Sequence, residues 1–206
     1  NKGGFAVGGL TPGKGAPNQY LTIEKDSARI YVDNSSKASK GGFAVGGLTP
    51  GKATVDNFMD VTPENVFLGH QAGINTVPIV ATYDGVYNNF IGYQSGLQNV
   101  DGFNNVFLGY KSGTNNSDGY RNVFIGTEAG TNNTSGALNT FLGNIAGLSN
   151  TTGVANTALG NYAGQGNTTG EENVFLGQSA GCQSETGIGN VFIGRASAYW
   201  NYSGVD

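Results

Sequence analysis

The segment from Gly46 to Ala53 contains most of the residues of a phosphate-binding loop. Its glycines would allow backbone N–H groups to surround a phosphate, and Lys52 would contact the phosphate oxygens. The motif ends in Ala53, however, where a Ser or Thr hydroxyl has to bind Mg²⁺, and Gly15 takes this place in the earlier copy of the segment. No helix is predicted to follow and direct its amides at a phosphate. We interpret the match as a product of Gly-rich composition.

Three aspartates, Asp84, Asp101 and Asp118, occupy the same turn position in successive repeats of the chain. Stacked carboxylates could hold a hard cation such as Ca²⁺, which prefers several oxygen ligands. Each Asp precedes a Gly, however, and Asp-Gly is an ordinary turn pair. The Gly-Gly-x-Gly-x-Asp phrase of calcium-binding repeats is absent. The pattern therefore predicts turns and no metal site.

The remaining reactive side chains are isolated. His70 is the only histidine, and it has no nearby cysteine or carboxylate cluster that would make a metal site or a catalytic triad. Cys182 is the only cysteine, so the chain forms no internal disulfide. A column of threonines in the later turns, with Thr134, Thr151 and Thr168 among them, suggests contact with ice or glycan, but we interpret it as turn structure. The sequence predicts no enzyme, no metal and no cofactor.

What dominates the chain is a 17-residue repeat. An Asn, two mostly apolar residues, an Ile or Leu and a Gly return at this spacing, and a second Gly follows ten residues later. The Asn positions are Asn88, Asn105, Asn122, Asn139, Asn156, Asn173 and Asn190. The same phrase begins once more at Asn65, 23 residues earlier, and the six extra residues lie within Asn75 to Tyr83. A fixed period indicates one structural unit stacked on copies of itself.

Each repeat is too short for a pair of helices, and its composition opposes helix formation. Gly accounts for 36 of 206 residues and costs a helix interior about 1 kcal/mol relative to Ala. A repeat instead consists of a strand such as Asn105 to Leu108, a Gly turn, a second short segment, and a polar turn that ends in Gly119. These features predict an all-β parallel solenoid, with coils stacked about 4.8 Å apart.

Two regions are expected on this basis. Residues 65–206 would form a regular solenoid of eight coils, and residues 1–64 would contain variant coils. Within the first region, the runs Tyr20 to Glu24 and Ala28 to Asp33 predict an inserted β-hairpin.

Two apolar columns follow the predicted strands, and alternation along a strand places them on opposite faces. One column is Ile or Leu in every coil; the other is Phe, interrupted only by Ala158. The Phe column comprises Phe67, Phe90, Phe107, Phe124, Phe141, Phe175 and Phe192. A 17-residue coil has a narrow interior that one column fills, so the Phe column or its Val/Leu counterpart would be exposed and would mark an interface. The alternative is a monomer in which the second segment encloses both columns.

The Asn column has a structural role in this interpretation. Asn residues stacked at one position can hydrogen-bond along the stack. We therefore expect Asn88 to Asn190 to be buried and paired, with Asn105, Asn122, Asn139, Asn156 and Asn173 inside the stack.

An apolar strand that ends in Ile-Gly or Leu-Gly, followed three residues later by Ala, resembles the head repeats of trimeric autotransporter adhesins. The matching alanines are Ala129, Ala146, Ala163 and Ala180. The resemblance covers about residues 65–198 well and residues 3–64 loosely. It implies a left-handed parallel β-roll of three chains, displayed on a bacterial surface in a fibre or adhesin. The repeat here is longer than is usual in that family, and Phe stands where the family often has Ala, which would change the spacing between chains.

Partners are predicted from charge and from exposed aromatic residues. Ten basic against fourteen acidic residues argue against nucleic acid as a partner, and the chain has no apolar run long enough to span a membrane. The main expectation is self-association in an extracellular structural module. The alternative is a module that recognises a glycan or host receptor through Tyr93 and Tyr110, stacked in neighbouring coils. Trp200, next to Tyr199, would either cap the last coil or dock the next subunit. Docking would join copies end to end, because no capping element is predicted ahead of the first variant coil of the chain.

Overall fold

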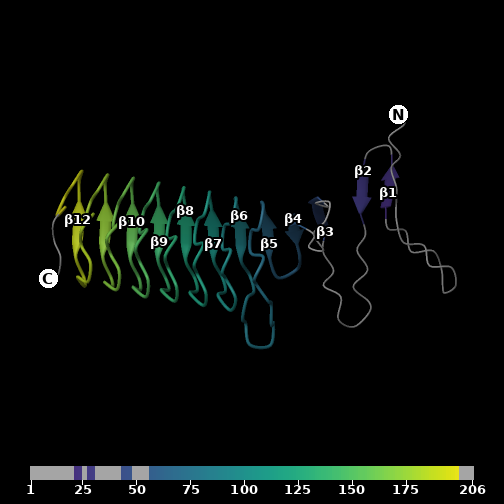
Figure 1. Cartoon of the computed structure of the whole chain (residues 1–206), viewed down its shortest axis with the longest axis horizontal. Helices are drawn as coiled ribbons and strands as arrows, with labels where there is room; N and C mark the ends of the chain where they lie inside the picture. The colour runs from purple at the N-terminus through teal and green to yellow at the C-terminus, as the bar shows by residue number, and fades with distance from the viewer. Residues whose placement is uncertain (1–20, 25–26, 31–42, 48–55, 200–206) are drawn as a thin grey trace. The chain divides into compact units, whose positions relative to one another are not determined.

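The computed structural model describes residues 21–24, 27–30, 43–47 and 56–199, with side chains from 59 to 199 (Figure 1). The chain divides into two compact units, residues 1–43 and 44–206. In the first unit, β1 (Leu21–Glu24) pairs antiparallel with β2 (Ser27–Ile30). The described residues contain strands and turns but no helix, and hence none that could cross a bilayer.

The second unit is built around one ten-stranded sheet with the order β12 to β3 (Figure 1). Two strands precede the repeats, β3 (Phe43–Gly47) and β4 (Asp56–Val61). The repeats contribute β5 (Val66–Leu68), β6 (Asn89–Ile91), β7 (Val106–Leu108), β8 (Val123–Ile125), β9 (Thr140–Leu142), β10 (Thr157–Leu159), β11 (Val174–Leu176) and β12 (Val191–Ile193).

Strands β5 to β12 pair in parallel, each with the equivalent strand of the next repeat. From β6 to β12 the paired residues differ by 17, as in Asn89 opposite Val106 and Val174 opposite Val191. The predicted parallel β-solenoid with 17-residue coils is therefore confirmed, with six regular turns between β6 and β12. The coil that begins with β12 runs into residues 200–206, outside the described part of the chain.

The Phe column fills the interior of the solenoid. From Phe67 to Phe141 consecutive rings stack with centroids 4.7–5.1 Å apart and planes within 13° of each other. Small residues face the rings: Ala129, Ala146 and Ala163 are fully buried, and a Cβ added to Gly96 would lie 2.5 Å from the ring of Phe90. Only small side chains fit opposite a ring inside so narrow a coil. The Phe residues are thus core residues and do not form an exposed interface; the Ile/Leu column is the outward one.

The one gap in the Phe column is closed by a neighbouring ring. Ala158 takes the place of a Phe, and the ring nearest to Gly164 of the same coil is that of Phe175, from the following coil. Phe175 also lies beside Gly181 of its own coil, so one ring serves two coils. The next pair, Phe175 and Phe192, is consequently tilted by 44° at 5.8 Å.

Glycine is required where each strand ends. Gly69, Gly92 and their equivalents up to Gly177 have φ between 132° and 142°, which L-residues rarely adopt. A Cβ at these positions would lie 2.2–2.7 Å from the backbone of the next coil's Gly. This close approach of backbones explains why the phrase always ends in Gly.

The first parallel strand of the regular coils is covered on its outer edge by β4. β4 pairs antiparallel with β5, with Met59 opposite Leu68 and Val61 opposite Val66. The first parallel strand is therefore covered by a strand of opposite direction, which does not offer the parallel pairing that the repeats use. The expectation that no capping element precedes the first variant coil concerns residues ahead of Leu21, outside the described part of the chain, and stays a prediction.

Candidate interaction surface

The outward side chains of β5 to β12 form a mostly apolar surface band, which we call the apolar stripe. It has two columns, the first and third residue of each strand, and no member is charged. The members are Val66, Leu68, Asn89, Ile91, Val106, Leu108, Val123, Ile125, Thr140, Leu142, Thr157, Leu159, Val174, Leu176, Val191 and Ile193. The exposed fraction is 41% for Leu108 and 64% for Ile193 at the last strand.

The size of the stripe decides how it can be used. Eight strands at about 4.8 Å span about 38 Å, and two side chains about 7 Å apart, each about 4 Å wide, make a band about 11 Å wide, so the stripe covers on the order of 400 Å². This is the size of the largest apolar patch on a typical monomer, about 300–600 Å², and such patches are often functional. It is about half of the roughly 800 Å² that each partner contributes to a standard interface. A stable assembly through the stripe therefore needs further contacts beside it.

The Asn column holds the strands that display the stripe, as predicted. Asn88 to Asn190 are at most 1% exposed, and each backbone N–H donates to the Oδ1 of the Asn in the preceding coil at 2.8–3.0 Å. From Asn88 to Asn173 the Nδ2 group donates to a Gly carbonyl 14 residues later, at 2.7–2.8 Å. We call this column the first Asn ladder. Because the ladder is continuous, every strand begins at the same position within its coil. The two columns of the stripe therefore stay aligned along the stack.

A second Asn ladder was missed by the sequence analysis. It consists of Asn99, Asn116, Asn133, Asn150 and Asn167, all at most 1% exposed. Each Nδ2 after the first donates to the Oδ1 of the preceding member at 2.7–3.0 Å. The same groups also donate to the Gly carbonyl three residues later. These residues also recur every 17 positions, so the period contained the signal.

The second ladder ends at a substitution. Ser184 occupies the next position, and neither its buried Oγ nor the Oδ1 of Asn167 has a hydrogen-bond partner. A serine side chain is too short to reach the preceding Oδ1 as an Asn does. The polar network thus has a defect between the last two described coils.

Three aromatic residues of successive coils form a continuous stack on the surface. His70, Tyr93 and Tyr110 stack on one another, with centroids 5.3 and 5.5 Å apart. Both faces of Tyr93 are therefore covered, and Lys111 Nζ lies 5.4 Å from the centroid of Tyr110. The predicted stacking of Tyr93 on Tyr110 is confirmed, and recognition of a glycan by these residues stays a prediction.

Other side chains with possible chemistry serve the turns. Asp101 and Asp118 are exposed, and the described residues contain no group of three His, Cys, Asp or Glu side chains that could hold a metal. The hydroxyls of Thr134, Thr151 and Thr168 donate to backbone carbonyls of the following coil at 3.0–3.1 Å. The threonine column is therefore part of the stacking, as the turn interpretation expected.

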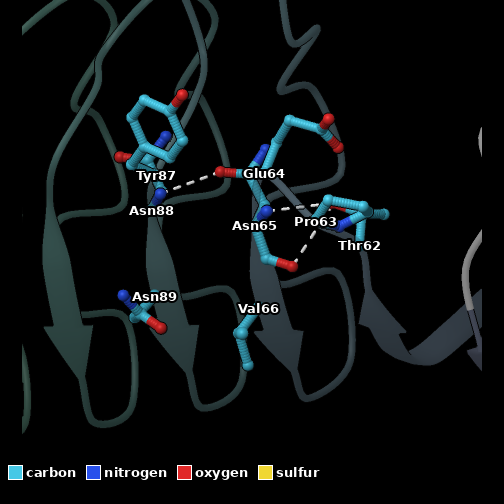
Figure 2. Close-up of a pocket in the computed structure, with 8 residues that line it drawn as sticks. All are labelled: Thr62, Pro63, Glu64, Asn65, Val66, Tyr87, Asn88 and Asn89. Atoms are coloured by element: carbon cyan, nitrogen blue, oxygen red, sulfur yellow. Dashed lines mark hydrogen bonds between the residues drawn. The ribbon is translucent and has the colours of Figure 1, made fainter.

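One hollow of about 240 Å³ lies where the turn after β4 meets β5 and β6 (Figure 2). Its lining comprises Thr62, Pro63, Glu64, Asn65, Val66, Tyr87, Asn88 and Asn89. The hollow is smaller than the 300–1,000 Å³ of ordinary ligand pockets. Asn65 and Asn88 donate to Gly carbonyls, and the Tyr87 N–H donates to the Glu64 carbonyl at 2.6 Å. Because these groups are already paired within the fold, the hollow offers a ligand few free polar partners.

Two predicted features fall outside the described residues: the loop-like segment beyond Gly47 up to Ala53, and Trp200. The role of Trp200 at the end of the stack thus stays a prediction. Comparison of the chain with protein-family models, with curated proteins and with solved structures finds no match.

Proposed function

We propose that this chain is a non-enzymatic structural module that associates with copies of itself through the apolar stripe. The observation that carries the proposal is an uncharged, exposed and largely aliphatic surface that continues over eight strands. Since the Phe column already fills the interior, the stripe is not needed for the core of the single chain. Outward Leu and Ile side chains that contribute nothing to that core are explained by burial against a partner.

A second copy of the chain is the partner that fits best. Both columns repeat at the coil spacing, so a stripe facing another stripe meets side chains at matching intervals. Full burial of about 400 Å² on each of two copies would contribute roughly 20 kcal/mol at 25 cal/mol/Å². Association itself costs an estimated 4–15 kcal/mol or more, so the balance is favourable but small.

The biological setting follows from the resemblance noted in the sequence. In this proposal the module is a left-handed roll in a trimeric bacterial surface fibre, filament or adhesin, outside the cell. Hydrogen-bonded Asn ladders and stacked rings suit a load-bearing rod, because every coil is bonded to its neighbours through side chains as well as backbone.

The test is the mass of the chain in solution, measured by sedimentation or light scattering. Leu108→Glu places a charge in the middle of the stripe and is expected to weaken association at least tenfold. Leu138→Glu is the matched control: Leu138 is 47% exposed on a turn, and other coils already carry the charged residues Arg121 and Glu172 at the equivalent position. A monomeric unaltered chain, or equal effects of the two substitutions, would overturn the proposal. Circular dichroism checks that both variants fold.

A further inference from the structure

The coil between β5 and β6 contains a loop that the solenoid does not need. In the next coil Val100 is followed directly by Asp101 and Gly102, whereas here six residues, Pro78 to Tyr83, separate Val77 from Asp84 and Gly85. The coil is bonded to the next coil on both sides of the insertion: the Thr76 hydroxyl donates to the Asn99 carbonyl at 3.2 Å, and the Gly85 N–H donates to the Asp101 carbonyl at 2.9 Å. Six coils of the same stack form without such an insertion.

The loop is held in a defined shape and carries apolar side chains outward. Ile79 pairs with Asp84 as an antiparallel bridge, and the Thr82 hydroxyl donates to the Asp84 carboxylate at 2.5 Å. The loop extends beyond the turns of the other coils (Figure 1). Its exposed apolar side chains, together with that of the nearby Tyr87, are 43–58% exposed; they are Val77, Ile79, Val80, Tyr83 and Tyr87. No charged residue occurs from Gln71 to Tyr83.

This apolar surface extends to the segment just before β6. Tyr83 contacts Tyr87 with ring centroids 6.4 Å apart, and Tyr87 lies two residues before Asn89, the first stripe position of β6. The stripe by itself supplies about half of the area that a partner in a standard interface contributes. Contacts made by the loop would supply part of the remainder.

The stripe alone does not determine how far a second copy is shifted along the solenoid axis. Its columns are nearly the same in every coil, so sliding one copy by a coil, about 4.8 Å, keeps Leu or Ile opposite Leu or Ile. Such a slide loses the contacts of only one coil in eight. A feature that occurs once in the described stack is needed to distinguish one position from the next, and the insertion is such a feature.

We propose that the loop Pro78–Tyr83 docks against a second copy of this chain and fixes the axial register of the lateral assembly. This inference rests on the proposed self-association. The loop adds apolar contacts at a single coil, so a copy shifted by one coil along the axis would lose these contacts entirely. The stripe thus provides the association, and the loop decides its alignment.

The test determines the axial alignment of two copies from the positions at which disulfides form between them. In a Cys182→Ser background, a chain with Leu108→Cys is mixed with chains that carry Cys at position 91, 108, 125 or 142. A disulfide requires Cα atoms about 4.4–6.8 Å apart, so yields distinguish neighbouring coils. With the loop intact, the disulfide is expected to form with one of the four positions. After deletion of Pro78 to Tyr83, which leaves a 17-residue coil, the disulfide that still forms should spread over two or more positions.

A second variant separates the apolar contacts from the length of the loop and does not depend on folding of the deletion. Ile79→Ser combined with Val80→Ser keeps the six residues, and it too should spread the disulfides. Pairing that stays at one position in both variants would overturn the inference while leaving self-association intact. Spread pairing with the loop intact would also overturn it. A chain that is monomeric with its loop intact would remove both proposals. Binding of the intact chain to phosphatidylcholine vesicles, with pairing unchanged by the deletion, would assign the loop to a lipid surface instead.

Discussion

Asn139 lies in the middle of the first Asn ladder, and its replacement by Ala tests whether the ladder stabilises the stack. The side chain is fully buried and forms bonds on both sides. Its Nδ2 donates to the Gly153 carbonyl at 2.7 Å, and its Oδ1 accepts from the backbone N–H of Asn156 at 2.9 Å. The backbone N–H of residue 139 keeps its own bond to Asn122 in the variant, because that donor is not removed.

The expected loss can be estimated from the groups left behind. The Asn156 N–H loses its partner inside the protein, which costs about 1–3 kcal/mol. The Gly153 carbonyl keeps a bond from Asn150 Nδ2 at 3.2 Å, so its loss is only the net value of one hydrogen bond, about 0.5–1.5 kcal/mol. Asn139→Ala should therefore lower the free energy of unfolding by about 2–4 kcal/mol.

The control is the same chemical change at an exposed position of the same coil. Asn144 donates to Asn161 Oδ1 at 3.0 Å on the surface, and Asn144→Ala should change stability by less than about 0.5 kcal/mol. Urea unfolding gives the stability of both variants, and hydrogen exchange reports the Asn156 amide directly. That amide should exchange faster in Asn139→Ala only. Equal stability of the two variants, or an unchanged exchange rate at Asn156, would refute the role assigned to the ladder.

Three other predictions concern single positions. Ser184→Asn should extend the second ladder, give Asn167 Oδ1 a donor and raise the free energy of unfolding in urea by about 1–2 kcal/mol. The control Ser135→Asn, on an exposed turn, should have no effect, and equal unfolding midpoints of the two variants would contradict the prediction. Leu138 is exposed with φ of 60°, so Leu138→Asn, a residue that tolerates this conformation, should stabilise the chain by up to about 1 kcal/mol; a loss of stability would show that the Leu contacts outweigh the strain. Burial raises the pKa of the Cys182 thiol, and a hydrogen bond with Tyr199 lowers it by a smaller amount. A disulfide reagent at pH 8 should therefore label this thiol at least tenfold more slowly in the folded chain than in urea. Equal labelling rates would mean that the thiol is accessible in the folded chain.

The period in the sequence was sufficient to predict the fold class and one of the two polar ladders. A 17-residue spacing without insertions leaves room for one short strand and two turns in each coil, and identical residues then stack at the inter-strand spacing. The Asn column follows from this alone, since residues of equivalent position in a stack must be neighbours. The second ladder recurs at the same spacing but was not predicted.

The tertiary structure decided which apolar column faces inward. Alternation along a strand places Phe on one face and Val and Leu on the other. It does not determine which of these two faces points into the coil. The choice depends on what lies across the coil: glycines such as Gly96 and small residues such as Ala129 leave space only for a flat ring stacked on its neighbours. The antiparallel start at β4, the stacking that covers the Tyr93 faces and the sharing of Phe175 between two coils likewise arise from contacts between coils. A repeat unit determines its own strand and turns, whereas the volume enclosed by several units together determines which side chains are left for the surface.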